Sequence, residues 1–456
     1  MVPNYVFHFL AISVLIVYFT SVGLDNVRVT RWEMFVPLVA HVARHVAVAI
    51  KYAYLPKPWY DRFVRVRMSI KETTSFLILG KLGWTALPEE TIEREIKRAA
   101  IRCHLDLNEQ VQLTRCRQFA EDAHACAQAL SVNGTCPRSA KVEGPTVETM
   151  TTGDILRVIV RESRIDAHIN AVTWALVPTI VAALLPTAFR IARSEPPVGR
   201  GVGEVYVVLA VFVLNVVLVG THFNFLCVAY NDMIRRRNMF YAVGDLIARE
   251  PLSRHATAGP GMQRLIGRVD LAQPANVALW VGLHRAVSVF GLDFYYRLSA
   301  LIVLAVLVAV VLVLIIFLQL LSGGVVSMHG IVLAVIFFAL TLAYLLVITS
   351  LAIAANDEVG HHVVTVVRTK MFLQAAAVTG SAAGGERLSD NLELVTTLLD
   401  SAQSSLDVLE RYRPLKVLGV RASNSIYSVF LSAALTIGGL TSGYVIQRYR
   451  NGQIVY

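Results

Sequence analysis

The sequence predicts an all-α, polytopic membrane protein with seven transmembrane helices, a cytoplasmic N-terminus and an extracellular C-terminus. Three observations lead to this prediction. Of the 456 residues, 55% are hydrophobic and 16% are charged, which is too apolar for an ordinary soluble domain. The apolar residues come in blocks that approach or exceed the roughly 20 helical residues needed to cross a bilayer core of about 30 Å. The connections between blocks alternate between short and long, so all the long ones fall on one side of the membrane.

The seven blocks differ in how clearly they predict a span. The first is also compatible with a signal peptide, although it lacks a basic segment at its start. The second carries Arg44 and Lys51, so an interfacial amphipathic helix is its alternative. The third contains two prolines, which membrane helices tolerate when neighbours re-satisfy the freed carbonyls. In chain order the blocks are Tyr5–Leu24, Phe35–Leu55, Ile169–Ala192, Val205–Tyr230, Ala300–Leu321, Ile331–Ala355 and Ile426–Gln447.

These blocks and their connections predict the organisation of the chain. Each long connection is expected to form a cytoplasmic segment, and the last block is the candidate pore helix. The predicted divisions are 1–55 with the first two transmembrane helices, 56–168 as a cytoplasmic helical loop, 169–230 with helices three and four, 231–298 as a second cytoplasmic loop, 299–355 with helices five and six, 356–424 as a cytoplasmic loop with an anchor helix, and 425–447 as the seventh helix.

Basic residues next to the spans predict the orientation. Arg235, Arg236 and Arg237 follow the fourth block directly, and Arg161 and Arg164 precede the third. The positive-inside rule places such flanking charges in the cytoplasm. The net charge of +10 is then an orientation signal beside anionic lipid. No basic stripe with interleaved aromatic residues is present, so nucleic acid is not an expected partner.

One set of residues favours the opposite orientation. Cys103, Cys116, Cys126 and Cys136 lie in one loop, beside the glycosylation acceptor pattern at Asn133. An oxidising, lumenal loop would explain them, but it would place the arginine cluster outside. The cysteine spacings match no zinc pattern.

The long connections contain predicted helices and breaks. Glu89–Leu130 is predicted to be a charged helix, and Ser131–Thr152, rich in Gly, Pro, Ser and Thr, a loose connector. Thr379–Gly385 is a predicted break. After it, apolar residues step by four and three, which is a heptad seam. The seam packs either on the chain's own bundle or against another subunit beside the membrane; its residues are Leu388, Leu392, Val395, Leu399, Ala402, Leu406 and Leu409. Pro414 is predicted to end this helix and Gly419 to mark a bend.

Histidine groupings are the main candidates for chemistry, because no nucleotide-binding or hydrolase motif is present. His41 and His45 have metal-ligand spacing, but a seven-span zinc hydrolase of the progestin-and-adipoQ-receptor kind would need histidines in the last span, which has none. Glu358, His361 and His362 share a helix face, which leaves a metal-dependent membrane enzyme as an alternative. A polar helix end that meets water is the simpler interpretation. We therefore predict no enzyme activity, no metal and no cofactor.

The last block has an unusual composition. Small and hydroxyl-bearing residues recur every three or four positions, so they form one stripe on a helix: Ser428, Ser432, Thr436, Gly439 and Gly443. Such a stripe either lets helices pack closely or lines a pore. The outer end of the block brings Thr441, Tyr444 and Gln447 close together.

In its topology, its long inner helix, its bend and its last span, the chain resembles the insect odorant and gustatory receptor superfamily, in particular its gustatory-receptor-like members. The last span of that family carries Thr-Tyr, five apolar residues and Gln-Phe. Gln447 matches the glutamine, whereas Leu440-Thr441 stands in place of Thr-Tyr and Arg448 in place of Phe. The resemblance covers most of the chain in layout and roughly the last 60 residues in pattern.

The resemblance implies a plasma-membrane, ligand-gated cation channel for chemosensation, built as a homotetramer whose last spans line a shared pore. A membrane carrier is the other alternative, although no internal repeat is visible. The ligand would be a small molecule. The implied pore or gate residues are Tyr444, Gln447 and Thr441. The implied subunit anchor consists of Leu388, Leu392, Val395, Leu399 and Leu406. The implied ligand pocket is lined by Phe35, Phe189, Tyr206, Phe337 and Phe338.

Overall fold

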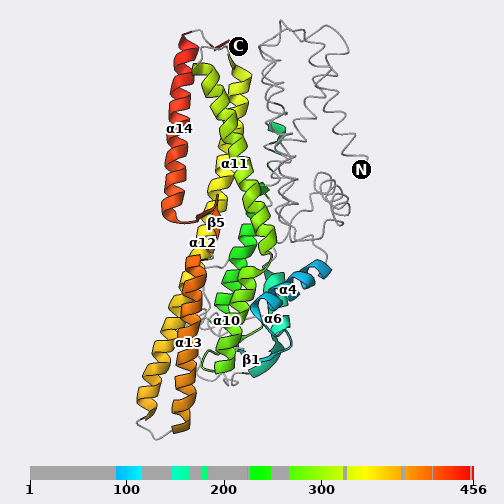
Figure 1. Ribbon diagram of the computed structural model, residues 1–456, viewed down its shortest axis with the longest axis vertical. Helices are drawn as coiled ribbons and strands as arrows, with labels where there is room; N and C mark the ends of the chain where they lie inside the picture. Colours follow the sequence, from blue (N-terminus) through cyan, green and yellow to red (C-terminus); the bar gives the residue numbers. More distant parts are fainter. Residues whose placement is uncertain are drawn as a thin grey trace, which may run out of the picture.

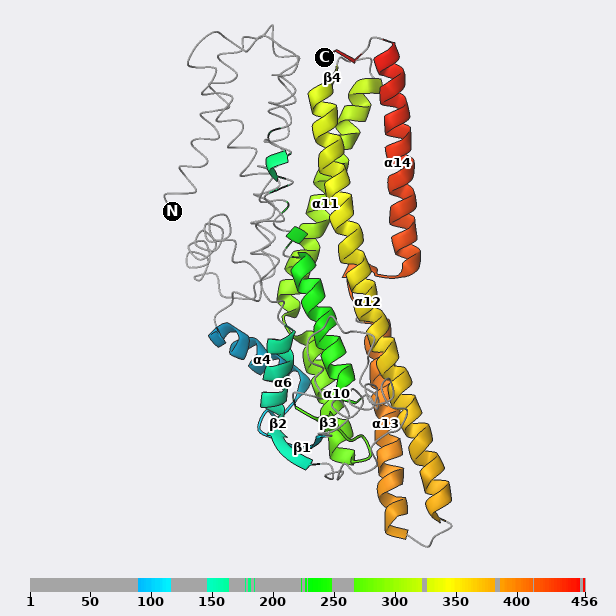
Figure 2. The same ribbon diagram turned by 180° about the vertical axis from the view of Figure 1, so that it is seen from behind.

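The computed structural model describes a mostly helical chain, as predicted. In Figures 1 and 2, helices α11 and α14 lie beside the N-terminal part of α12, and together they form an upper bundle. Below them, α4, α6, a small sheet, a helix over 229–245, α10, α13 and the C-terminal part of α12 form a lower lobe. The described residues are 89–115, 146–163, 229–247, 266–321, 326–381, 386–412, 414–451 and 454–455, with scattered positions between 177 and 227.

Helix α12 (Met328–Ser381) connects the two levels. Its 54 residues give a length of roughly 80 Å at 1.5 Å per residue. Within it, Phe337–Ala375 is long and apolar enough to cross a membrane by length and composition, and it is the one such helix in the described part of the chain. The sequence predicted that the helix of the sixth span ends near Ala355. This is wrong, because α12 continues to Ser381. The helix continues because no proline interrupts the sequence before Ser381.

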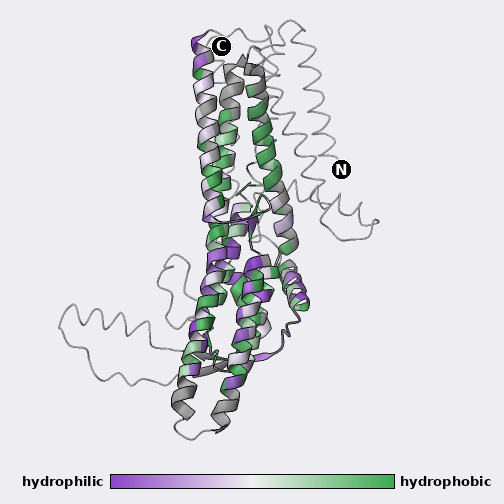
Figure 3. Ribbon diagram, turned by 60° about the vertical axis from the view of Figure 1, so that its left-hand side comes forward, coloured by the Kyte–Doolittle hydropathy of each residue, from purple (hydrophilic) through white to green (hydrophobic). Residues whose placement is uncertain are grey.

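The upper bundle contains two further predicted spans. Helix α11 (Leu292–Leu321) includes the predicted fifth span, and α14 (Asn424–Arg450) includes the seventh. Hydrophobic residues dominate α11 and the upper part of α12, whereas polar residues become frequent in the lower lobe (Figure 3). Two short strands, β4 (Val326–Ser327) and β7 (Ile454–Val455), pair in parallel near the upper end of the bundle. The first two predicted spans lie outside the described residues.

Helix α13 (Glu386–Tyr412) packs against α12 and α10 (Pro274–Val289) in the lower lobe. Its heptad residues Val395, Leu399, Ala402 and Leu406 are all 2% exposed or less, and Leu392 is half-buried in the same core. These side chains therefore pack on the chain's own bundle, which is one of the two interpretations of the seam, and the subunit contact stays a prediction. The side chain of Leu388 lies outside the described set.

A three-stranded antiparallel sheet completes the lobe, with the strand order β2-β1-β3. The sequence did not predict it. Its strands and flanking helices are α4 (Glu89–Cys103), β1 (Gln110–Arg115), β2 (Thr146–Thr151), α6 (Thr152–Glu162) and β3 (Arg268–Val269).

The predicted helix over Glu89–Leu130 is therefore wrong for residues 104–115, and residues 116–130 lie outside the described residues. At His104 the backbone takes a positive φ of 53°, which ends the helix. In β1, Val111 and Leu113 are buried whereas Gln112 between them is exposed, the alternation of a half-buried strand. The predicted loose connector ends in strand β2, so it too is corrected.

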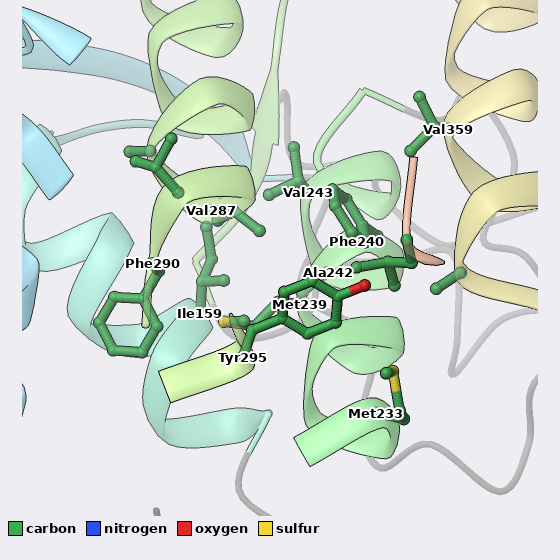
Figure 4. Close-up of a cluster of buried hydrophobic side chains, with 14 of the residues drawn as sticks. Ile159, Met233, Met239, Phe240, Ala242, Val243, Val287, Phe290, Tyr295 and Val359 are labelled. Carbon is green, nitrogen blue, oxygen red and sulfur yellow. The ribbon is translucent and has the colours of Figure 1, made fainter. Parts of the chain in front are cut away.

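The core of the lobe lies where α6, helix 229–245, α10 and α12 meet (Figure 4). Ile159, Val243 and Val287 point into this core, and Phe240 and Val359 lie beside them. The indole N–H of Trp280 donates a hydrogen bond to the carbonyl of Val243 at 3.0 Å. Helix 229–245 is thus held against α10 and α12.

A short hairpin joins α13 to α14. It consists of β5 (Lys416–Val417) and β6 (Val420–Arg421), and its turn holds Leu418 at φ 53° and Gly419 at φ 80°. Glycine adopts such angles without steric cost, so the predicted bend at Gly419 after Pro414 is confirmed. Ser423 caps α14 by accepting a hydrogen bond from the N–H of Ile426.

Candidate functional site: a buried polar junction and a histidine pair

A buried ion triad lies at the start of the lower lobe. Within helix 229–245, the carboxylate of Asp232 accepts hydrogen bonds from Arg235 Nη2 at 2.5 Å and from Arg236 Nε at 2.8 Å. All three side chains are at most 3% exposed. The spacing of three and four residues brings them to one helix face.

The protonation states of the triad keep it charged at neutral pH. Burial alone would raise the pKa of Asp232, but the charges of Arg236 and Arg235 outweigh it, so the pKa lies below its usual value. Burial lowers the pKa of Arg235 to about 10, although Asp232 favours the protonated form. The triad therefore has two cations and one anion in a buried position.

Carbonyl and aromatic groups compensate the excess positive charge. Arg236 Nη2 donates to the carbonyl of Gly291 at 2.8 Å, and its guanidinium lies 4.8 Å from the centre of the Tyr295 ring. Arg235 lies over the ring of Phe290 at 5.3 Å. Cation–π contacts of this kind are favourable when desolvated. They connect helix 229–245 to the start of α11.

Tyr295 extends the network to the hairpin below α14. Its hydroxyl donates to the carbonyl of Lys416 at 2.8 Å and accepts from the N–H of Lys416 at 2.7 Å. From the other side, Asn356 of α12 donates to the carbonyls of Leu415 and Ala422, each at 3.1 Å, and accepts from the N–H of Leu415 at 2.8 Å. One tyrosine and one asparagine thus hold both strands of the hairpin.

We call this network the polar junction; its members are Asp232, Arg235, Arg236, Tyr295, Asn356 and the backbone of residues 415–422. It lies where the apolar blocks end, because Asn356 directly follows Ala355 and Tyr295 precedes Ala300. It joins helix 229–245, α11, α12 and the base of α14. The first three elements therefore all contact the base of α14 through this network or are linked to it.

A second polar cluster lies deeper in the lobe. His284 of α10 and His362 of α12 are fully buried, and their Nε2 and Nδ1 atoms are 3.1 Å apart. Glu358 Oε1 lies 3.5 Å from His362 Nε2. The rings of Trp280 and Phe240 surround His284, with centroids at 5.6 Å and 5.7 Å. We call His284, His362 and Glu358 the histidine pair and its carboxylate.

Burial in this aromatic surrounding, together with the nearby His362 and Arg285, holds the pKa of His284 well below its usual value. Helix 229–245 approaches α12 closely beside this pair. At Gly244, an added Cβ would lie 2.3 Å from His362 Nε2 and 3.1 Å from Glu358 Oε1. A glycine is therefore required at this contact.

The predicted grouping of Glu358, His361 and His362 is brought together only in part. His361 lies 3.6 Å from Glu358, but its side chain is 68% exposed, whereas His362 is buried. In the part of the chain that the structure describes, no group of three or more His, Cys, Asp or Glu residues is placed to hold a metal ion. The grouping also lies within α12 rather than at its end.

The predicted pore stripe is exposed along its length. Tyr444 instead turns toward α11, where its ring centroid lies 5.9 Å from that of Phe317. Gln447 is exposed, and Thr441 lies on the same helix. An added Cβ at Gly439 or Gly443 would meet no heavy atom within 4 Å. The exposed members are Ser428, Ser432, Thr436, Gly439 and Gly443.

Of the predicted pocket residues, only two are described. Phe337 is buried against Phe223 with a centroid distance of 5.4 Å, and Phe338 is half-buried. Phe337 thus serves as a packing residue between α12 and the segment before helix 229–245. Phe35, Phe189 and Tyr206 lie outside the described residues.

Two sets of site residues were missed from the sequence. Arg235 and Arg236 were interpreted as charges facing lipid headgroups, but both are buried. The spacing of Asp232 to these arginines was the available signal. Tyr295 and His284 gave no local signal, because their partners lie 121 and 78 positions away.

No protein-family model and no curated protein sequence matches the chain.

Proposed function

We propose that the chain is a multi-pass plasma-membrane protein that forms a chemoreceptor-like, ligand-gated cation channel, with four copies arranged around a pore lined by α14. The observation that supports this most directly is the exposed surface of α14. Its 27 residues give a length of roughly 40 Å, enough to cross a bilayer core of about 30 Å.

The exposed residues of α14 include large apolar side chains as well as the small stripe. Val429 is 58% exposed, Leu435 68% and Ile446 54%, which is unfavourable in water and suits lipid or another protein surface. The small stripe offers hydroxyls at Ser432 and Thr436, followed by Gly439 and Gly443. Small residues allow close approach of helices, and hydroxyls can face a hydrated pore. Both properties favour an assembly of several copies around α14.

The polar junction supports gating through α14. It ties the hairpin at the base of α14 to three other helices through a tyrosine, an asparagine and a buried ion triad. A ligand that shifts α11 or α12 in the upper bundle would therefore displace the start of the pore helix. Gating requires such a mechanically coupled element with two arrangements.

Cysteine cross-linking tests the proposed arrangement. In a background without the five native cysteines, we expect Ser432→Cys to form disulfide-linked dimers between copies and a charged thiol reagent to reduce the bilayer current. Phe430→Cys is the matched control, because Phe430 packs toward the chain's own core. A purified protein that stays monomeric, without cross-links at Ser432→Cys, would contradict the proposal.

A further inference from the structure

The histidine pair has a proton-accepting atom that the structure leaves unused. His284 Nδ1 and His362 Nε2 are buried and have no hydrogen-bond partner among the described residues. Since Glu358 Oε1 lies 3.5 Å from His362 Nε2, the neutral tautomer with its proton on that nitrogen is favoured. His362 Nδ1 then accepts the Nε2–H of His284 across 3.1 Å. In this arrangement His284 Nδ1 has a free lone pair.

We propose that His284, His362 and Glu358 form a buried proton-binding site that joins α10 to α12 and changes their contact when the lobe is acidified. A proton from solvent binds His284 Nδ1, and the Nε2 proton of His284 moves across the hydrogen bond to His362 Nδ1. One proton enters and none leaves. His284 remains neutral with its proton on Nδ1, and His362 becomes an imidazolium beside the carboxylate of Glu358.

Surrounding charges determine the direction of this equilibrium. Glu358 on α12 favours the imidazolium, whereas the positive charge of Arg285 on α10 opposes it. His361, also on α12, shares the carboxylate at 3.6 Å, and Asp357 adds a negative charge near Tyr241. From helix 229–245, Tyr241 lies close enough to both carboxylates for burial and their charges to raise its pKa, so it stays neutral.

Proton binding at the histidine pair makes the free energy of unfolding depend on pH. Because burial holds the pKa of His284 well below 6.5 in the folded chain, the unfolded chain binds more protons below about pH 6.5. The free energy of unfolding therefore falls as the pH drops below that value, with a limiting slope of about 1.4 kcal/mol per pH unit for one proton.

Trp280 provides the readout, because its ring centroid lies 5.6 Å from that of His284 and 6.0 Å from that of His362. An imidazolium quenches indole fluorescence more strongly than a neutral imidazole. The full-length protein in lipid nanodiscs is titrated from about pH 8, above the range in which imidazoles titrate, down to the lowest pH at which its helical circular dichroism is retained. Subtracting the signal of Trp280→Phe removes the contribution of the other four of the five tryptophans.

We expect one quenching transition below pH 6.5 in the wild type, with unchanged helical circular dichroism. His362→Gln abolishes it. Glu358→Gln lowers its midpoint by about one pH unit or more, because it removes the counter-charge. His361→Gln, a change in an exposed neighbour on the same carboxylate, keeps the transition.

Three results would overturn the proposal: no transition in a folded wild type, a transition that persists unaltered in Glu358→Gln, or its loss in His361→Gln. If His362→Gln does not fold, Glu358→Gln still decides the test. The titration measures no current, so a failure of the proton-binding site does not contradict the proposed channel. Conversely, a protein that proves to be monomeric could still bind the proton.

Discussion

At the scale of single residues, buried charge is the feature with the largest energetic consequence. The carboxylate of Asp232 pairs with two arginines that are at most 3% exposed. The stability of the fold around these two buried cations depends strongly on that carboxylate, because a desolvated charge without its partner is unfavourable. Gly244 is the second critical residue, because its missing side chain lets helix 229–245 reach His362.

Replacing Asp232 by Asn should destabilise the protein by about 3–5 kcal/mol, since it removes the carboxylate that pairs with both buried guanidinium groups. Glu410→Gln is the control. It breaks the pair with Arg421, whose side chain is 46% exposed, and should cost at most about 1 kcal/mol. Thermal unfolding in detergent compares the two; equal shifts would show that the triad is not desolvated as described.

Gly244→Ala should cost about 1–3 kcal/mol, because the added methyl group overlaps His362 and forces α12 away. Gly360→Ala in α12 is matched to it, since no heavy atom lies within 4 Å of the added Cβ. That change should be neutral or stabilise the helix by up to about 1 kcal/mol. The melting temperatures of the two variants, measured side by side, check this, and similar values would argue against the close contact.

At the scale of elements, the β5–β6 hairpin connects the lower lobe to α14. Its backbone is held by side chains from α11 and α12 rather than by a core of its own. A hairpin of two-residue strands is not stable alone. The orientation in which α14 leaves the lobe therefore depends on the polar junction.

Tyr295→Phe removes both hydrogen bonds to Lys416 while it keeps the ring over Arg236. We expect amide exchange at residues 415–422 to accelerate roughly 5- to 30-fold, corresponding to about 1–2 kcal/mol of lost local stability. Tyr296→Phe is the control, because that neighbouring side chain is 47% exposed. Hydrogen exchange followed by mass spectrometry measures both; unchanged exchange in Tyr295→Phe would contradict the role of the junction.

At the scale of the whole molecule, the orientation in the membrane decides where the lobe lies. The buried Arg235 and Arg236 no longer serve as flanking charges, which weakens that part of the positive-inside argument. Arg161, which precedes the third predicted span, remains exposed. The lobe contains the histidine pair, so the compartment on this side also sets the pH to which that pair responds.

Glycosylation mapping tests this orientation. With the N-terminus in the cytoplasm and seven spans, an Asn-x-Ser acceptor added after Tyr456 should be glycosylated in cells, whereas the natural acceptor at Asn133 should not. A shift in gel mobility that an endoglycosidase removes reports each site. If Asn133 is glycosylated and the C-terminal acceptor is not, the orientation is the reverse of the proposed one and the lobe lies outside.

The sequence alone determined the helical class, the bend at Gly419 and the small stripe of α14, because periodicity and glycine angles act over a few neighbouring residues. It did not predict the sheet, whose strand β1 pairs with β2 across a long gap. It placed Arg235 at a lipid surface and His362 at a helix end. Only the tertiary structure decided that both are buried, since their partners come from distant segments that meet through packing. Local pattern shows which residues are polar, and the fold decides what they contact.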